Sequence, residues 1–303
     1  MSKHVPVLLK EVLELLQLKT GMNVIDCTLG DAGHAEKILE ATAPYGKLLG
    51  IDADMEAVLR AKQFLYKNED RVVFVRDNFV NLGSILEENN FGPANGILMD
   101  LGWSTPQFED RGRGFSFLQP EEKLDMRFAG NEMKMSAADI VNELDFGRLV
   151  IIFKKYGEEN LSKQIVKAIV DKRKEKRIET VGELVEIVLQ VYRDKLKTEK
   201  EIPWIGGIHP ATKVFQALRI AVNDELKVLE QTLPQAVEAL APGGRLAVIS
   251  FHSGEDRIAK TYFKKQNGKI LNIINKKPIV CSDEEGKENP RARSAKLRVI
   301  EKL

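Results

Sequence analysis

Acids and glycines follow an apolar run near the N-terminus, in the string V-I-D-C-T-L-G-D-A-G-H at residues 24–34. Glycine lets a backbone approach a ligand closely, and the first turn of a helix offers unpaired N–H groups. The string therefore predicts a cofactor-binding turn between a strand and a helix. Glycine is also used in tight turns that bind nothing, so this signal alone is weak. The order Gly30-Asp31-Ala32-Gly33 lacks the spacing G-x-G-x-x-G, which argues against a nicotinamide dinucleotide.

Asp52 ends the next apolar run, at 47–52, about twenty residues beyond the glycine turn. A carboxylate at that position can accept hydrogen bonds from both hydroxyls of a ribose. The alternative is that Asp52 caps the following helix, a role that Asp54 could also fill. Together with the glycine turn, Asp52 favours a cofactor that contains adenosine.

A third string, D-L-G-W-S-T-P-Q-F at 100–108, follows a further apolar run and combines an acid, two hydroxyls, a proline and an amide. At the end of a parallel strand, these groups would face a cofactor bound at the same edge of the sheet. We therefore expect the reaction centre here, although ordinary loops have a similar composition. Trp103 is either a core residue or a platform on which a base stacks.

A fourth string, I-S-F-H-S-G-E-D-R at 249–257, again carries a strand into a polar turn. His252 and Asp256 suggest catalysis, but the serine elbow G-x-S-x-G is absent. A histidine and a serine in one turn are more often a structural hydrogen-bonded pair. We place His252 in the site because its strand would end at the same edge of the sheet.

Basic residues cluster at two places, although the formal net charge of the chain is only +1. Such clusters are either phosphate-contacting surfaces or solvated helix faces, and the second cluster tips the balance slightly toward RNA. The first cluster comprises Lys163, Lys167, Lys172, Arg173, Lys174, Lys176 and Arg177, with only Asp171 and Glu175 to offset it. The second comprises Arg291, Arg293, Lys296 and Arg298.

Residues 22–100 alternate between short apolar runs and helical patterns, the rhythm of βαβ units. It predicts four parallel strands with right-handed crossovers, joined later by strands at 245–251 and near 296–301. Between residues 106 and 208 the sequence has helical periodicity and many charged residues. We therefore predict a doubly wound α/β domain made of 1–105 and 209–303, with 106–208 as an inserted helical domain for substrate recognition.

Two cysteines, Cys27 and Cys281, cannot build a disulfide framework, and the four histidines lack the close spacings of a zinc site. We expect no metal and a reducing, cytoplasmic compartment. The apolar periodicity at the N-terminus is interrupted by charges, unlike a signal peptide. No apolar stretch approaches the ~18 residues of a membrane helix.

Longer strings appear in a recognisable order: H-V-P-V-L-L, D-x-T-x-G-x-x-G-H, D-L-G-x-S-x-P-Q, R-G-F-S-F, L-D-M-R, H-P-A-T-K-x-F-Q-A-L-R-I-A-V-N, G-G-R-L-A-V-I-S-F-H-S and N-P-R-A-R-S-A-K-L-R. Over nearly its whole length the chain resembles the bacterial ribosomal small-subunit methyltransferase H family, also called MraW. The resemblance implies S-adenosylmethionine-dependent methylation of the N4 amine of a cytosine in 16S ribosomal RNA, near the decoding centre. It also implies a class I methyltransferase sheet, Rossmann-like, with an inserted helical domain.

Family motifs assign the cofactor to seven positions of this chain, which are Ala32, Gly33, His34, Asp52, Phe79, Asp100 and Gln107. The sequence departs from the family pattern with Ala32 in place of glycine and Gly254 in place of leucine. An exocyclic amine has a delocalised lone pair, so a site must orient it and accept its hydrogens. We expect Asp100 and backbone carbonyls around Ser104 to Pro106 to do this, with His252 nearby and Trp103 or Phe251 stacked on the base.

Two other classes of protein are alternatives. A nucleotide-cofactor oxidoreductase should carry a dinucleotide fingerprint, which is absent. A catalytically silent RNA-binding assembly factor on the same scaffold should have lost Asp52 or the Asp100–Gln107 string, and both are present. The expected partner is 16S ribosomal RNA within the small subunit, and a homodimer is left open.

Overall fold

A computed structural model describes residues 6–102, 112–128, 134–198 and 208–303. The chain divides into two compact units, Met1–Ser104 with Leu226–Leu303, and Thr105–Glu225. We call them the sheet unit and the helical unit.

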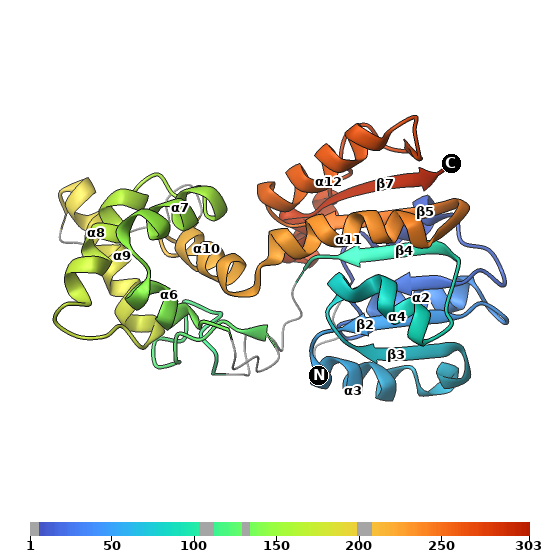
Figure 1. Cartoon of the computed structure of the whole chain (residues 1–303), viewed down its shortest axis with the longest axis horizontal. Coiled ribbons are helices and arrows are strands. Elements are labelled where there is room, and N and C mark those ends of the chain that lie inside the picture. Colours follow the sequence, from blue (N-terminus) through green and yellow to red (C-terminus); the bar gives the residue numbers. More distant parts are fainter. Residues whose placement is uncertain (1–5, 103–111, 129–133, 199–207) are drawn as a thin grey trace. The chain divides into compact units, whose positions relative to one another are not determined.

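Within the described residues, the sheet unit contains a seven-stranded sheet in the order β3-β2-β1-β4-β5-β7-β6 (Figure 1). The five strands β1 to β5 are parallel, and β7 pairs antiparallel with both β5 and β6. The predicted doubly wound α/β fold is thereby confirmed. The strands are β1 (Val24–Asp26), β2 (Leu48–Asp52), β3 (Val72–Arg76), β4 (Ala94–Asp100), β5 (Leu240–Ser250), β6 (Leu271–Ile273) and β7 (Lys296–Lys302).

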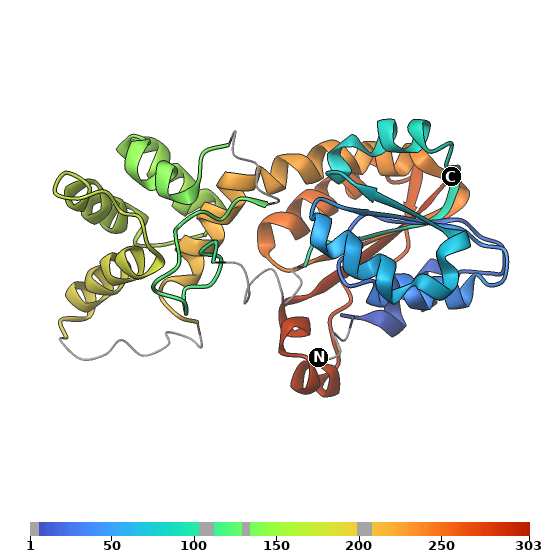
Figure 2. The same cartoon turned by 90° about the horizontal axis from the view of Figure 1, so that it is seen from below.

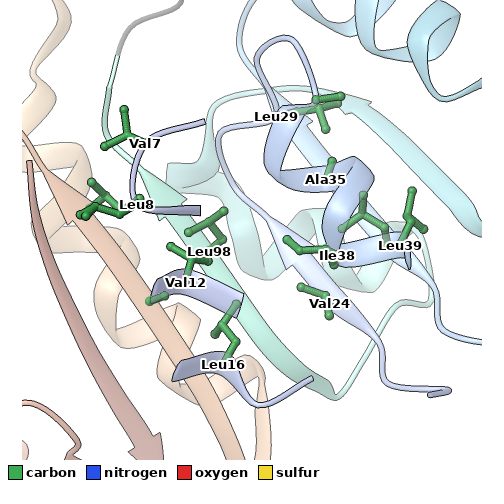
Figure 3. Packing of buried hydrophobic residues seen from close by; sticks show 14 of the residues in the cluster. Val7, Leu8, Val12, Leu16, Val24, Leu29, Ala35, Ile38, Leu39 and Leu98 are labelled. Atoms are coloured by element: carbon green, nitrogen blue, oxygen red, sulfur yellow. The ribbon is translucent and has the colours of Figure 1, made fainter. Parts of the chain in front are cut away.

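Helices cover both faces of this sheet, as Figure 2 shows. The helices α1, α2 and α3 pack on one face, where Figure 3 shows Ile38 and Leu39 of α2 close to Val24 of β1. The other face is covered by α4, α11 and α12. Because both faces are buried, the central strands are continuous apolar runs that end at polar residues. The helices are α1 (Leu9–Leu16), α2 (Gly33–Ala41), α3 (Met55–Phe64), α4 (Leu82–Glu88), α11 (Glu225–Ala239), α12 (Ser253–Gln266) and α13 (Asp283–Glu288), with short 3-10 turns η1 (Tyr66–Arg71), η2 (Phe79–Asn81) and η4 (Pro290–Ser294).

The helical unit is built from five described helices, α6 (Ala137–Glu143), α7 (Phe146–Tyr156), α8 (Ser162–Lys172), α9 (Val181–Leu196) and α10 (Thr212–Asn223). Side chains that bond the first free N–H groups of a helix mark where it begins, as at α9. The Thr180 hydroxyl accepts from the Glu183 N–H, and the Glu183 carboxylate accepts from the Thr180 N–H, which closes a capping box at α9. Leu184, Val188 and Val191 recur at helical spacing and are buried.

The C-terminal boundary of the helical unit differs from the predicted boundary at 208. The helix α10 packs against α7 and α6, so the unit extends to Glu225. The helical spacing of the apolar residues over 213–233 predicts one continuous helix. Asp224 instead adopts a left-handed conformation, with φ of 54°, and separates α10 from α11. In the described part of the chain, no helix is long and apolar enough to cross a bilayer.

Candidate active site

Asp52 lies at the carboxyl end of β2 and holds the glycine turn in place. Its Oδ2 accepts from the Gly30 N–H at 2.9 Å, and its Oδ1 accepts from the Asp54 N–H at 2.8 Å. Burial raises the pKa of Asp52 to about 6, and the two backbone donors oppose that rise. The cap of α3 is Asp54, whose side chain accepts from the Glu56 N–H. The alternative role of Asp52 as the helix cap is therefore excluded.

Asp26 lies at the carboxyl end of β1, the strand between β2 and β4 in the sheet. It is buried, with 1% exposure, and accepts from the Thr28 N–H at 3.0 Å. The Thr28 hydroxyl accepts in turn from the Asp100 N–H at 2.7 Å, which joins the ends of β1 and β4. Burial raises the pKa of Asp26 to about 6, although the neighbouring His34 lowers it.

His34 begins the first turn of α2 and is buried between the N-terminal segment and Asp100. Its Nε2 lies 3.0 Å from the Val7 carbonyl oxygen, and its Nδ1 lies 3.6 Å from Asp100 Oδ2. Burial lowers the pKa of His34, against the opposing effect of Asp26. The turn before it requires glycine at position 33, because a Cβ there would lie 2.6 Å from Pro6 Cγ. Pro6 of the motif H-V-P-V-L-L thus packs directly on the glycine turn.

Asp100 is followed by a glycine that brings an aromatic ring close to it. The Gly102 N–H donates to Asp100 Oδ1 at 3.1 Å. A Cβ on Gly102 would lie 2.7 Å from the Phe251 ring and 2.9 Å from Asp100 Oδ1. The ring of Phe251, a candidate for base stacking, therefore lies beside Asp100 at the end of β5.

Glu255 fixes the turn that carries Phe251 and His252. It is 4% exposed, and its Oε2 accepts from the Phe251 N–H at 2.8 Å. His252 is the N-cap of α12, where its Nδ1 accepts from the Gly254 N–H at 3.2 Å. Its Nε2 lies 3.2 Å from Glu255 Oε1. His252 therefore has a helix-capping role whether or not it contacts a substrate.

The buried pair Asp256–Arg298 joins α12 to β7, with Arg298 Nε 2.6 Å from Asp256 Oδ1. Both oxygens of Asp256 are thus held by the guanidinium of a buried arginine.

The structure places His34 beside Asp100, and Asp52 holds Gly30 of the same turn. Cofactor binding by Gly33, His34, Asp52 and Asp100 stays a prediction. Ala32 lies in the turn itself, with a left-handed φ of 62° that glycine adopts at a lower steric cost than alanine. Phe79 begins η2, just after Asp77 donates its N–H to the Asp52 carbonyl. The predicted residues Trp103, Ser104, Pro106 and Gln107 lie outside the described residues.

The basic run 163–177 is only partly available to a ligand. Arg173 donates to the Val141 and Leu144 carbonyls, both at 2.8 Å, and so caps the end of α6. Four other members pair with nearby acids, while Lys163 and Lys167 are exposed and have no ion pair in the described part of the chain. The four pairs are Lys172–Glu175, Lys174–Asp171, Lys176–Glu183 and Arg177–Asp139.

The second basic cluster lies in η4 and β7 of the sheet unit. Arg293 is exposed and donates to the Gly286 carbonyl at 2.7 Å, while Arg298 is buried in its pair with Asp256. Arg291 is partly exposed. RNA binding by Arg291 and Arg293 stays a prediction.

Two functional candidates were missed by sequence reasoning, Asp26 and Glu255. Asp26 ends an apolar run as Asp52 and Asp100 do, and that shared position could have identified it. Glu255 stands three residues after His252, the spacing of a capping box.

Comparisons with known proteins identify the family. The model of the MraW methylase family matches residues 1–303. A protein of Dictyoglomus thermophilum named ribosomal RNA small subunit methyltransferase H is 46% identical over 99% of this chain and 97% of its own length. A protein of Heliobacterium mobile with the same name is 45% identical over 99% of both chains. A solved rRNA methylase from Streptococcus thermophilus aligns with 97% of this chain and 93% of its own, with 10% identity and a TM-score of 0.44.

The family match covers every residue, and both relatives exceed 40% identity along nearly the full chain. The resemblance inferred from the motifs is confirmed, and the chain belongs to the MraW methylase family.

Proposed function

We propose that the protein transfers a methyl group from S-adenosylmethionine to the N4 amine of a cytosine in 16S ribosomal RNA, near the decoding centre, in the cytoplasm. The observation that carries the proposal is the full-length match to relatives named ribosomal RNA small subunit methyltransferase H. The polar groups at the carboxyl ends of β1, β2 and β4 support it chemically.

The residues present fit this cofactor. Each oxygen of Asp52 accepts one backbone N–H and keeps a lone pair for a ribose hydroxyl. At Gly30, with φ of +51°, a Cβ would meet one atom of the described residues within 4 Å besides its chain neighbours, the Thr28 carbonyl oxygen at 3.8 Å, so the backbone leaves room for a ligand. When bound, the cofactor supplies an electrophilic methyl group on a sulfonium.

We assign to Asp100 the role of accepting the hydrogens of the cytosine amine. Its backbone N–H is fixed by Thr28 and its Oδ1 by Gly102, so the carboxylate is oriented before substrate arrives. Such preorganisation is what an acceptor of developing positive charge requires. Ser104 and Pro106 contribute backbone carbonyls in this proposal, and Gln107 contacts the cofactor.

A covalent route through cysteine is disfavoured. Methylation at cytosine C5 needs a thiolate, but Cys27 is buried beside β1 and burial raises the pKa of its thiol strongly. Cys281 follows β6 and lies next to α13. The attack of the amine on the methyl carbon therefore proceeds without a bond to the enzyme.

The helical unit supplies phosphate contacts in this proposal. Lys163 and Lys167 are its exposed candidates without a salt bridge in the described residues, and the paired members of the run contribute less because acids already neutralise them. Trp103 stacks on the base that leaves its helix.

Nucleoside mass analysis tests the proposal, applied to 16S ribosomal RNA from cells with and without the protein. We expect N4-methylcytidine at one position only when the protein is present. Methylation at C5, or no difference, would contradict the reaction. Unchanged methylation with impaired subunit assembly would point to a silent assembly factor.

A further inference from the structure

The buried imidazole of His34 has its two nitrogens in different surroundings. A carbonyl oxygen only accepts hydrogen bonds, so Nε2, which lies 3.0 Å from the Val7 oxygen, must carry a proton and donate it. In a neutral imidazole the other nitrogen then carries a lone pair. That nitrogen, Nδ1, lies 3.6 Å from Asp100 Oδ2.

The tautomer is fixed by the N-terminal segment. Val7 is 4% exposed, and the next residue, Leu8, donates its N–H to Glu285 Oε1 at 2.7 Å. Pro6 packs against Gly33, where no side chain would fit. The carbonyl that orients His34 is therefore held from both sides.

We infer that His34 is a positioning residue that accepts, through Nδ1, the proton that Asp100 takes from the amine. This inference rests on the proposed function. It assigns to His34 a role in proton transfer that is separate from contact with the cofactor.

The proton balance of the reaction requires such an acceptor. The amine nitrogen bonds to the methyl carbon as the carbon–sulfur bond breaks and leaves its electron pair on sulfur. The nitrogen becomes positively charged and gives one proton to the Asp100 carboxylate. Protonated Asp100 then donates to His34 Nδ1, which needs a closure of less than about 1 Å to reach hydrogen-bond distance.

The charges around His34 suit this role. Asp26, Asp100 and Glu285 act on it from the ends of β1 and β4 and from α13, and their negative charges would favour an imidazolium once a proton arrives. Burial outweighs them before that and lowers the pKa of His34, so Nδ1 is unprotonated at neutral pH. The site therefore has an empty proton acceptor beside Asp100 that can take up the proton after methyl transfer.

Two isosteric variants separate proton transfer from structure. His34→Gln keeps a donor for Val7 but removes the acceptor that faces Asp100, whereas His34→Asn places an amide near Asp100 and loses the donor. We expect single-turnover methyl transfer at saturating S-adenosylmethionine to fall about 10- to 100-fold in both, since saturation removes any change in cofactor affinity from the comparison. We also expect the wild-type rate to fall as pH drops through the lowered pKa of His34, and this limb to vanish in His34→Gln.

Nitrogen NMR of the cofactor-free protein labelled at histidine gives a readout independent of activity. The His34 signals, assigned with the His34→Gln variant, should show a proton on Nε2 and none on Nδ1 at about pH 7.5. A proton on Nδ1, or full transfer with an unchanged pH profile in His34→Gln, overturns the inference. Failure of the wild type to form N4-methylcytidine would instead refute the proposed function, while the tautomer would still be measured.

Discussion

The carboxyl edge of the sheet and the basic run 163–177 were predicted from the sequence with similar reasoning, yet they differ in how the fold treats them. At the edge, Asp52 and Asp100 come from separate strands and are joined through Gly30, Thr28 and short hydrogen bonds. In the basic run, most charges pair with acids within the helical unit. Parallel strands bring their carboxyl ends together by topology, whereas a cluster in sequence on helices says little about where each side chain goes.

The largest effect should come from removing Asp52, because it holds the glycine turn and, in the proposed function, accepts from the ribose hydroxyls. Asp52→Ala should weaken binding of S-adenosylmethionine by about 3–6 kcal/mol, since two charge-assisted hydrogen bonds contribute ~1.5–3 kcal/mol each. Titration calorimetry measures this. The matched control is Asp54→Ala, which removes the cap of α3 and should cost about 1 kcal/mol of stability with little loss of affinity. An equal loss of S-adenosylmethionine affinity in both variants would show that Asp52 affects binding only through the start of α3.

Asp26 tests whether a buried carboxyl group at the carboxyl end of β1 makes the stability of the protein depend on pH. Its pKa is raised to about 6 in the folded protein from 3.8, so the folded state binds the proton more tightly than the unfolded state. The contribution of Asp26 to stability therefore increases as pH falls from about 7 toward 4, by up to about 3 kcal/mol at ~1.4 kcal/mol per pKa unit. Urea unfolding across this range should show a smaller gain in Asp26→Asn than in wild type, because Asp52, whose pKa burial also raises to about 6, still contributes in the variant. Parallel curves would mean that Asp26 is solvated.

Within the basic run 163–177, Arg173 should stabilise the fold, whereas Lys163 and Lys167 should bind RNA. Arg173→Ala should destabilise the helical unit by about 1–3 kcal/mol, because two carbonyls at the end of α6 would be left without their donor. Lys163→Ala with Lys167→Ala should leave the melting temperature unchanged and flatten the log–log salt slope of RNA binding by ~0.7–0.9 for each phosphate that the variant no longer neutralises. Thermal unfolding and salt-dependent RNA binding are measured on both variants. An intact salt slope in the lysine variant would identify the run as a solvated face.

The smallest effect is expected at Ala32, whose left-handed φ of 62° is unfavourable for a residue with a Cβ. Ala32→Gly should stabilise the sheet unit by about 0.5–1 kcal/mol, with glycine's greater freedom when unfolded offsetting part of the gain. Ala35→Gly lies in the interior of α2 and should destabilise by a similar amount. Reduced stability in Ala32→Gly would mean that the turn adapts to alanine without strain.

The strands and the positions of Asp52, Asp100 and His34 could be predicted because hydrophobic periodicity and chain order fix them. The break at Asp224 could not, since the apolar period continues across it and only a backbone conformation separates the two helices. The pairing of His34 with Val7 joins residues far apart in sequence, and no local pattern encodes it. Arg173 shows the same limit, because its charge suggested phosphate while its partners are carbonyls at the end of α6.

Asp100→Asn provides the most direct test of the account, with cofactor affinity and single-turnover transfer to 16S ribosomal RNA measured on one preparation. The neutral amide keeps the size of the side chain and an oxygen for the Gly102 N–H, but it cannot take a proton. We predict a dissociation constant for S-adenosylmethionine within about threefold of wild type and a transfer rate at least ~100-fold lower, with N4-methylcytidine as the wild-type product. Unchanged transfer, or a fall in transfer explained entirely by weaker cofactor binding, would contradict the assignment of the amine to Asp100.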